Sequence, residues 1–134
     1  MSRWFHEMEM TVPFFDCDPM QVVWHGHYLK YFEICRQTML DKLGYGYFAM
    51  RDSGYLWPVV DVRLKYVRPA VLQQKITVRA EIVEYENRLK VEYVITSNGE
   101  KLTRGYTVQV AVNAKTNELE YVTPPELWKA LGVS

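Results

Sequence analysis

The sequence predicts an α+β domain in which a curved antiparallel sheet of about five strands wraps around one long helix. Apolar residues recur at helical spacing over residues 28–43, and from residue 57 onward apolar and polar residues alternate in strand-like rows. The Asn98-Gly99 pair is typical of a tight hairpin turn between two such rows. Hairpins pair neighbouring strands antiparallel, and the single long helix is the only element able to cover their apolar face. This arrangement is called a hotdog fold.

The first half of the chain is expected to hold one strand and the long helix. Apolar and polar residues alternate from Glu7 to Phe14, which indicates a half-buried strand. The helix is expected from about Tyr28 to Leu43, where Gly44 provides a C-terminal stop. Its apolar surface is broad, and three polar side chains are expected to point away from the core: Lys30, Arg36 and Asp41.

The second half is expected to hold four strands and a short terminal helix. Four rows of alternating apolar residues are each expected to turn one face to the core: Val60 to Tyr66, Ile76 to Ile82, Leu89 to Ile95 and Tyr106 to Val112. The segment "TPPELWKAL" predicts a helix opened by prolines. The chain shows no internal repeat and no linker, so residues 1–134 are expected to form a single hotdog domain.

Composition restricts the classes of function. The 16 basic residues balance the 16 acidic ones, so no overall charge favours nucleic acid or an anionic membrane surface. No apolar run approaches the roughly 20 residues of a membrane span, and the first ten residues lack the apolar stretch of a secretion signal. We therefore expect a cytoplasmic protein. Cys17 and Cys35 fit no C-x-x-C pattern and are expected to be free structural thiols.

The stretch "FFDCDPMQVVWHGHYLKYFE", residues 14–33, concentrates the polar chemistry of the chain. It holds Asp16, Asp18, His25 and His27 just before and at the start of the long helix. An Asp before a Pro is a common turn residue, so Asp18 alone fits a turn as well as a reaction centre. A metal site needs three or four convergent ligands, and the only further histidine is His6, so neither a metal nor another cofactor is expected.

This stretch, followed by "VRPA" at residues 67–70, resembles the 4-hydroxybenzoyl-CoA thioesterase and YbgC group of hotdog acyl-thioester hydrolases. In that family a D-x-D pair closes the first strand, an apolar V-[YW] pair follows, and a histidine or an aromatic residue stands seven residues after the second Asp. The helix then carries Y-x-x-x-[YF]-E. The chain departs from the family at Met20-Gln21, where relatives commonly have a small residue and a glycine.

The resemblance implies that Asp18 is catalytic, either as nucleophile on the thioester carbonyl or as general base for water, and the sequence leaves both open. Thioester hydrolysis places negative charge on the carbonyl oxygen, and free N–H groups at a helix start stabilise such charge. His25 matches the YbgC branch and is the second expected catalytic residue, through its imidazole or only its backbone N–H. Asp16 is expected to order the loop by accepting backbone N–H bonds, and His27 to be structural.

The substrate is expected to be an acyl thioester of coenzyme A or of an acyl carrier protein. The segment "YENRLK", residues 85–90, lies where hydroxybenzoyl-type relatives place basic residues, which implies that Arg88 and Lys90 bind the carrier phosphates. Two charges on a hairpin are also typical of a plain solvated surface.

A non-catalytic acyl-CoA-binding hotdog protein is the alternative function, and the presence of Asp18 favours the enzyme. Exposed sheet edges are normally paired or covered, and hotdog relatives pair two subunits into one sheet. We therefore expect a homodimer or homotetramer, with Asp18 of one chain near residues 59–61 of another. The sequence does not identify the acyl group of the substrate.

Overall fold

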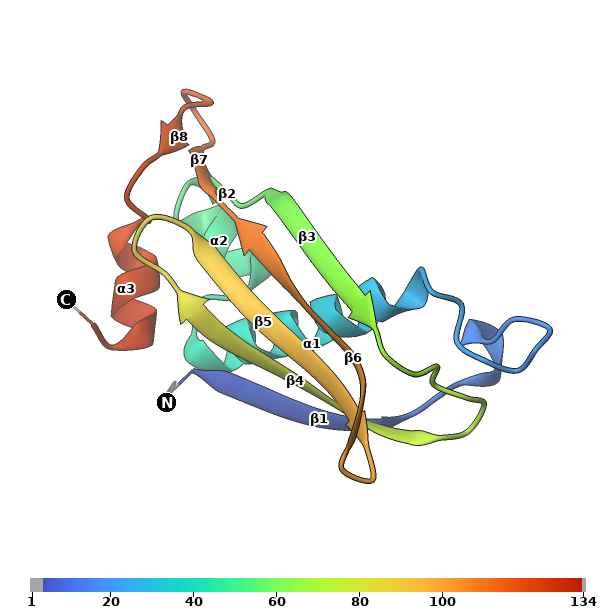
Figure 1. Ribbon diagram of the computed structural model, residues 1–134. Helices are drawn as coiled ribbons and strands as arrows, with labels where there is room; N and C mark the ends of the chain where they lie inside the picture. Colours follow the sequence, from blue (N-terminus) through green and yellow to red (C-terminus); the bar gives the residue numbers. More distant parts are fainter. Residues whose placement is uncertain (1–3, 134) are drawn as a thin grey trace.

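A computed structural model describes residues 4–133 and shows a five-stranded antiparallel sheet that wraps around one long helix, α1 (Figure 1). The strand order is β1-β4-β5-β6-β3, and every neighbouring pair is antiparallel. This is the predicted hotdog arrangement. Residues 1–3 and 134 of the predicted domain, including the first residues of the segment considered as a secretion signal, lie outside the described part.

The elements follow the predicted order with some additions. The main sheet holds β1 (Phe5–Thr11), β3 (Val59–Tyr66), β4 (Lys75–Glu84), β5 (Leu89–Ser97) and β6 (Glu100–Gln109). A second sheet, which was not predicted, joins β2 (Tyr55–Leu56), β7 (Ala111–Asn113) and β8 (Leu119–Glu120). The helices are α1 (His27–Leu43), α2 (Tyr47–Asp52) and α3 (Pro125–Leu131), with a 3₁₀ turn, η1 (Phe14–Asp16), before α1.

Helix α1 forms the centre of the core. It ends at Gly44, whose φ of 89° is left-handed and therefore suits glycine. Phe32 on α1 stacks on Tyr93 of β5 with a ring centroid distance of 4.4 Å. The buried apolar face of the helix contacts alternate residues of the sheet; its members are Tyr28, Tyr31, Phe32, Cys35, Met39 and Leu40. Burial of this apolar face provides most of the free energy that holds α1 against the sheet.

The first strand ends earlier than predicted. Pro13 has no N–H to donate to a ladder, and Phe14 lies in η1 with its side chain exposed, so its predicted place in the strand is wrong. This early end frees residues 12–26 to form the loop that precedes α1.

Two polar side chains lie in the core where the pattern predicted otherwise. Arg36 was expected to point away from the core but is only 7% exposed, and its guanidinium donates to the hydroxyls of Tyr93 and Thr107 at 3.5 and 3.4 Å. In β6, Thr107 faces the core while Tyr106 lies on the outer face opposite Glu92, which reverses the predicted facing of this strand. The two hydroxyls of Tyr93 and Thr107 lie 2.6 Å apart and satisfy each other.

Strand β3 is exposed on both faces, although one face was predicted to be buried. Helix α1 packs mainly against β1 and β4, at the opposite side of the sheet. Val62 is therefore 39% exposed and Tyr66 is 50% exposed. The free edge of the sheet is thus apolar and open to a partner.

Both cysteines are free, as predicted. Burial raises the pKa of the Cys35 thiol to about 11, so this thiol is inert at neutral pH. Within residues 4–133, none of the helices combines the length and the apolar character that crossing a membrane requires.

Candidate active site

Of the two residues predicted to be catalytic, Asp18 lies on a short two-stranded ribbon, residues 16–24, and His25 directly follows it. The ribbon lies at the end of the sheet where α1 begins (Figure 1, blue). Cys17 pairs antiparallel with Val23, and the N–H of Asp18 donates to the Val22 carbonyl at 2.9 Å. The N–H of Trp24 donates to the Asp16 carbonyl at 3.1 Å. The ribbon is therefore held by backbone bonds, which fixes the positions of its side chains.

Asp18 occupies the tip of the ribbon and forms the turn that closes it. Its Oδ1 accepts the N–H of Met20 at 2.8 Å, and its carbonyl accepts the N–H of Gln21 at 2.9 Å. Gln21 has a φ of 65°, the left-handed conformation that glycine adopts most easily. The glycine that the family resemblance implies at this position would adopt this conformation without strain. The side chain of Asp18 is partly exposed, and Oδ2 has no donor among the described residues.

Asp16 is buried and serves a different purpose from the predicted one. Its carboxylate, 3% exposed, accepts from Lys30 Nζ at 2.6 Å and from the Tyr31 hydroxyl at 2.7 Å rather than from backbone N–H groups. Burial alone would raise the pKa of Asp16, but these two hydrogen bonds outweigh burial and hold the pKa below its ordinary value. Asp16 thus ties the ribbon to the first turns of α1, while the Asx turn expected of it is formed by Asp18.

The start of α1 presents free backbone donors. Gly26 is the N-cap residue, and no side chain caps the helix. Among residues 4–133, the N–H groups of His25 and Gly26 donate to no acceptor. A Cβ at residue 26 would overlap the Trp24 ring, so this close approach requires glycine. Free N–H groups and the positive end of the helix dipole together favour a negatively charged oxygen at this point.

The His25 side chain is exposed and lies between two aromatic rings. Its ring centroid is 4.9 Å from that of Trp24 and 6.4 Å from that of Tyr66. The Tyr66 hydroxyl donates to the His25 carbonyl at 3.0 Å, which links the end of β3 to the helix start. Asp18 thus lies at the tip of the ribbon and His25 directly after its base, and no hydrogen bond joins their two side chains.

His27 is the first residue of α1 and does not cap it. Its Nε2 lies 3.9 Å from Asp16 Oδ1, and its ring packs edge-on against Trp24. The structural interpretation of His27 therefore agrees with its contacts.

The "VRPA" segment holds the ribbon from the other side. The Ala70 carbonyl accepts the N–H of Val23 at 2.8 Å, and the Ala70 N–H donates to the Tyr28 hydroxyl at 3.0 Å. Residues that are distant in the sequence thus fix one site.

Arg88 and Lys90 do not lie near this ribbon within one chain. They belong to the β4–β5 hairpin, at the opposite end of the sheet, next to α3 (Figure 1). Arg88 Nε donates to Glu84 at 3.1 Å, and Lys90 Nζ lies 4.5 Å from the centre of the Tyr106 ring. Their predicted contact with the substrate stays a prediction.

A groove of about 490 Å³ runs along the exposed side of α1 and begins at Gly26. Leu29 and Ile34 supply apolar surface in it, and Glu33 and Arg36 supply charge. The sequence motif singled out Glu33 but gave no sign of this groove, because the groove depends on which side of α1 the sheet leaves uncovered.

The sequence matches a known protein family and is similar to the sequences of several named proteins. The model of the thioesterase-like superfamily matches residues 12–131. YneP of Bacillus subtilis, provisionally named an acyl-CoA thioesterase, is 33% identical over 85 residues, which cover 63% of this chain and 61% of that protein. A Synechocystis protein provisionally named an esterase is 28% identical over 128 residues, covering 92% of this chain and 76% of that protein.

Solved structures show the same fold. The DHNA-CoA thioesterase of Staphylococcus aureus superposes with a TM-score of 0.84 at 26% identity, over 96% of this chain and 89% of that chain. A hypothetical protein of Thermus thermophilus has the same TM-score and identity, over 95% of this chain and 97% of that chain.

Fold and site together define a hotdog protein with a partly exposed carboxylate and free N–H groups at the start of its central helix. The chain belongs to the thioesterase-like superfamily, since the family model spans most of its length. The prediction of a thioester hydrolase is confirmed at the level of the family, and the roles of Asp18 and His25 stay predictions.

Proposed function

We propose that the protein is an acyl-CoA thioesterase that hydrolyses its substrate to a free acid and a thiol, with Asp18 as its catalytic carboxylate. The observation that carries this proposal is the ribbon together with the helix start that directly follows it: the ribbon holds a carboxylate with a free oxygen, and the next two residues, His25 and Gly26, have free N–H groups. The relatives named for acyl-CoA and DHNA-CoA thioesters support coenzyme A as the carrier.

The free N–H groups of His25 and Gly26 are the proposed donors to the carbonyl oxygen. As the tetrahedral intermediate forms, negative charge develops on that oxygen, and fixed donors at a helix start stabilise it more than the ground state. The first turn of α1 contains no acidic residue that would oppose this charge. A carbonyl bound there places the acyl group at the end of the groove that begins at Gly26.

Asp18 can act by either of two balanced routes. As nucleophile, a carboxylate oxygen bonds to the carbonyl carbon while the C–S bond breaks; the leaving thiolate takes a proton from water, and the hydroxide so formed hydrolyses the acyl-aspartyl anhydride to the free acid and the Asp18 carboxylate. As general base, the carboxylate takes a proton from water, whose oxygen bonds to the carbonyl carbon as the C–S bond breaks, and the protonated carboxyl then gives this proton to the leaving thiolate. The bond from Met20 holds Oδ1 in place and leaves Oδ2 for either role.

The proposed assembly is a dimer formed through β3. A strand exposed on both faces, with apolar side chains along it, is an edge that needs a partner. Antiparallel pairing of two β3 strands would place the Tyr66 end of one chain beside the Val59 end of the other. The Val59 end of the sheet also carries the β4–β5 hairpin, so Arg88 and Lys90 would lie on the same side of the dimer as the partner's ribbon.

Release of free thiol from a panel of acyl-CoAs tests the proposed activity. We expect Asp18→Asn to lower kcat at least ~100-fold, since a positioned base or nucleophile contributes at least that much. Asp16→Asn, on the same ribbon, is the matched control and should keep most of its turnover. Tight acyl-CoA binding without thiol release above the Asp18→Asn background would instead identify a non-catalytic binding protein.

A single turnover in ¹⁸O-labelled water tests for the nucleophilic route. Label recovered in the Asp18 carboxylate by mass spectrometry of the peptide would identify this route, because water then attacks the aspartyl carbon of the anhydride. Label found in the free acid alone fits both routes, because water can also attack the acyl carbon, so detection of an acylated Asp18 peptide after an acid quench decides between them.

A further inference from the structure

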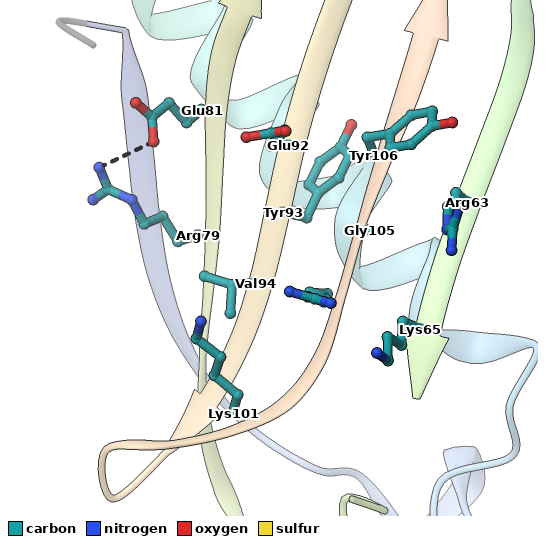
Figure 2. A pocket seen from close by; sticks show the side chains of 11 residues that line it. Arg63, Lys65, Arg79, Glu81, Glu92, Tyr93, Val94, Lys101, Gly105 and Tyr106 are labelled. Atoms are coloured by element: carbon teal, nitrogen blue, oxygen red, sulfur yellow. Dashed lines mark ion pairs between the residues drawn. The ribbon is translucent and has the colours of Figure 1, made fainter. Parts of the chain in front are cut away.

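The outer face of the sheet, opposite α1, carries a hollow of about 470 Å³ that the predicted site does not include (Figure 2). Strands β3, β4, β5 and β6 all contribute to it. The side chains that define its chemistry are charged: Arg63, Lys65, Arg79, Lys101, Arg104, Glu81 and Glu92.

This hollow is strongly positive in a chain that has no net charge. Its five cations outnumber its two carboxylates by three, whereas the formal net charge of the whole protein is zero. Arg79 pairs with Glu81 at 3.6 Å and with Glu7 at 3.4 Å, as Figure 2 shows for the first of these pairs. Within residues 4–133, the other four cations have no carboxylate at ion-pair distance. The excess charge is therefore unneutralised.

The strand register makes this arrangement unfavourable in the absence of an anion. Lys65 of β3 lies directly opposite Arg104 of β6, and like charges directly opposite on neighbouring strands destabilise a sheet. Arg63, two residues earlier, lies opposite Tyr106 on the same face. A bound anion would remove the repulsion, and guanidinium groups bind phosphate with paired hydrogen bonds.

The hollow lies just across the sheet edge from the candidate catalytic ribbon. Lys65 is adjacent to Tyr66, whose hydroxyl contacts the His25 carbonyl. Successive strand residues point to opposite faces, so Tyr66 reaches the ribbon while Lys65 points into the hollow. In coenzyme A a flexible pantetheine arm separates the thioester from the phosphates, so a phosphate site away from the reacting carbonyl is what this carrier requires.

We propose that this outer face binds the phosphate groups of the coenzyme A carrier, with Arg63, Lys65, Lys101 and Arg104 as their ligands. The proposal rests on the proposed acyl-CoA thioesterase function and names where the carrier is held. It differs from the predicted hairpin site, because Arg88 is already paired with Glu84. Lys90, stacked on Tyr106, lies at the border of the hollow.

Kinetics on two thioesters of the same acid test this proposal: the acyl-CoA and the acyl-N-acetylcysteamine, which has no phosphate. We expect Arg104→Gln and Lys65→Gln each to raise KM for acyl-CoA about tenfold, the effect of losing one charged hydrogen bond. Their kcat/KM on the N-acetylcysteamine thioester should not change. Glu92→Gln removes a negative charge from the hollow and should lower KM for acyl-CoA, while Lys115→Gln, in an exposed turn, is the neutral control.

Calorimetric titration with adenosine 3′,5′-bisphosphate tests the site without turnover. We expect the wild-type protein to bind it, in a salt-dependent manner, and Arg104→Glu to abolish binding. This titration remains informative if the wild-type protein hydrolyses no thioester, so failure of the proposed function and failure of the site are distinguishable.

Four results would overturn the phosphate site. These are an equal loss on both thioesters, an unchanged KM for acyl-CoA in every outer-face variant, an increase in KM only for Arg88→Gln, and a loss confined to an acyl-carrier-protein substrate. The last would make the face a docking surface for an acidic protein instead.

Discussion

Replacing Asp16 tests whether the two carboxylates of the ribbon have separate roles. Asp16 is buried and accepts hydrogen bonds from the Tyr31 hydroxyl and from Lys30, whereas Asp18 lies partly exposed at the tip. Asp16→Ala removes both acceptors, and Asp16→Asn retains one acceptor of similar shape. Stability should therefore fall in the order wild type, Asp16→Asn, Asp16→Ala, while turnover depends mainly on Asp18.

The magnitude follows from what each partner loses. The Tyr31 side chain is fully buried, so removal of its acceptor leaves an unpaired buried hydroxyl and costs about 1–3 kcal/mol. Lys30 is 41% exposed and regains water, so its ion pair contributes at most about 1 kcal/mol. We expect Asp16→Ala to lower the free energy of unfolding by about 1–4 kcal/mol, measured by urea titration of tryptophan fluorescence.

The same carboxylate gives the protein a defined acid sensitivity. Because the pKa of Asp16 is lowered in the folded state, its contribution to stability is complete above the ordinary carboxyl pKa of about 4. That contribution is lost as the pH falls through the folded-state pKa. The stability of Asp16→Asn should consequently depend less on pH in this acid range than that of the wild type.

Two observations would refute this reasoning. The first is an Asp16→Ala variant with the urea midpoint and slope of the wild type. The second is an Asp16→Asn variant whose turnover falls as far as that of Asp18→Asn, since Asp16 would then be a member of the reacting set.

Three further tests concern other parts of the structure. If the imidazole positions the substrate, His25→Ala should lower kcat at least ~10-fold. If only the backbone N–H of His25 matters, His25→Phe should keep most of the activity. A turnover near that of the wild type in both variants, with unchanged melting temperatures as the control, would remove the His25 side chain from the mechanism. Sedimentation should show at least a dimer at micromolar concentration and a monomer for Val62→Lys, and a wild-type monomer would contradict the β3 interface. Arg36→Met should have a melting temperature equal to or above that of the wild type, because it removes a buried charge and leaves the Tyr93–Thr107 hydrogen bond intact. A decrease of more than about 2 kcal/mol in the free energy of unfolding would instead show that the guanidinium stabilises the core.

Local sequence patterns predicted the elements of the fold well. The long helix, the terminal helix and the strands β3, β4 and β5 lie close to their predicted ranges. The predicted row from Tyr106 to Val112 is instead divided between β6 and β7. The Asn98-Gly99 hairpin was predicted from the positive φ that both residues tolerate, and their φ values are 50° and 79°. These features depend on neighbours in the sequence, so a single chain suffices to predict them.

Which side chains of a strand face the core was harder to predict, because this depends on contacts with residues that are distant in the sequence. Thr107 faces the core because Tyr93 satisfies its hydroxyl, and Tyr106 faces outward beside Lys90. The exposure of β3 depends on where α1 crosses the sheet and is invisible to a pattern of alternating residues. The positive hollow likewise exists only because strands distant in the sequence pair side by side.

In the proposed mechanism, the turn formed by Asp18 and the reaction centre are one structure. A turn residue normally uses its carboxylate to bind its own backbone, and Asp18 does this with Oδ1. That bond is what fixes the carboxylate, so the remaining oxygen needs no reorganisation to attack a carbonyl or to accept a proton. Gln21 holds the turn in a left-handed conformation that costs about 1–2 kcal/mol for a residue with a Cβ. Local strain that the surrounding structure tolerates is common at functional sites, and here it lies three residues from the proposed catalytic carboxylate.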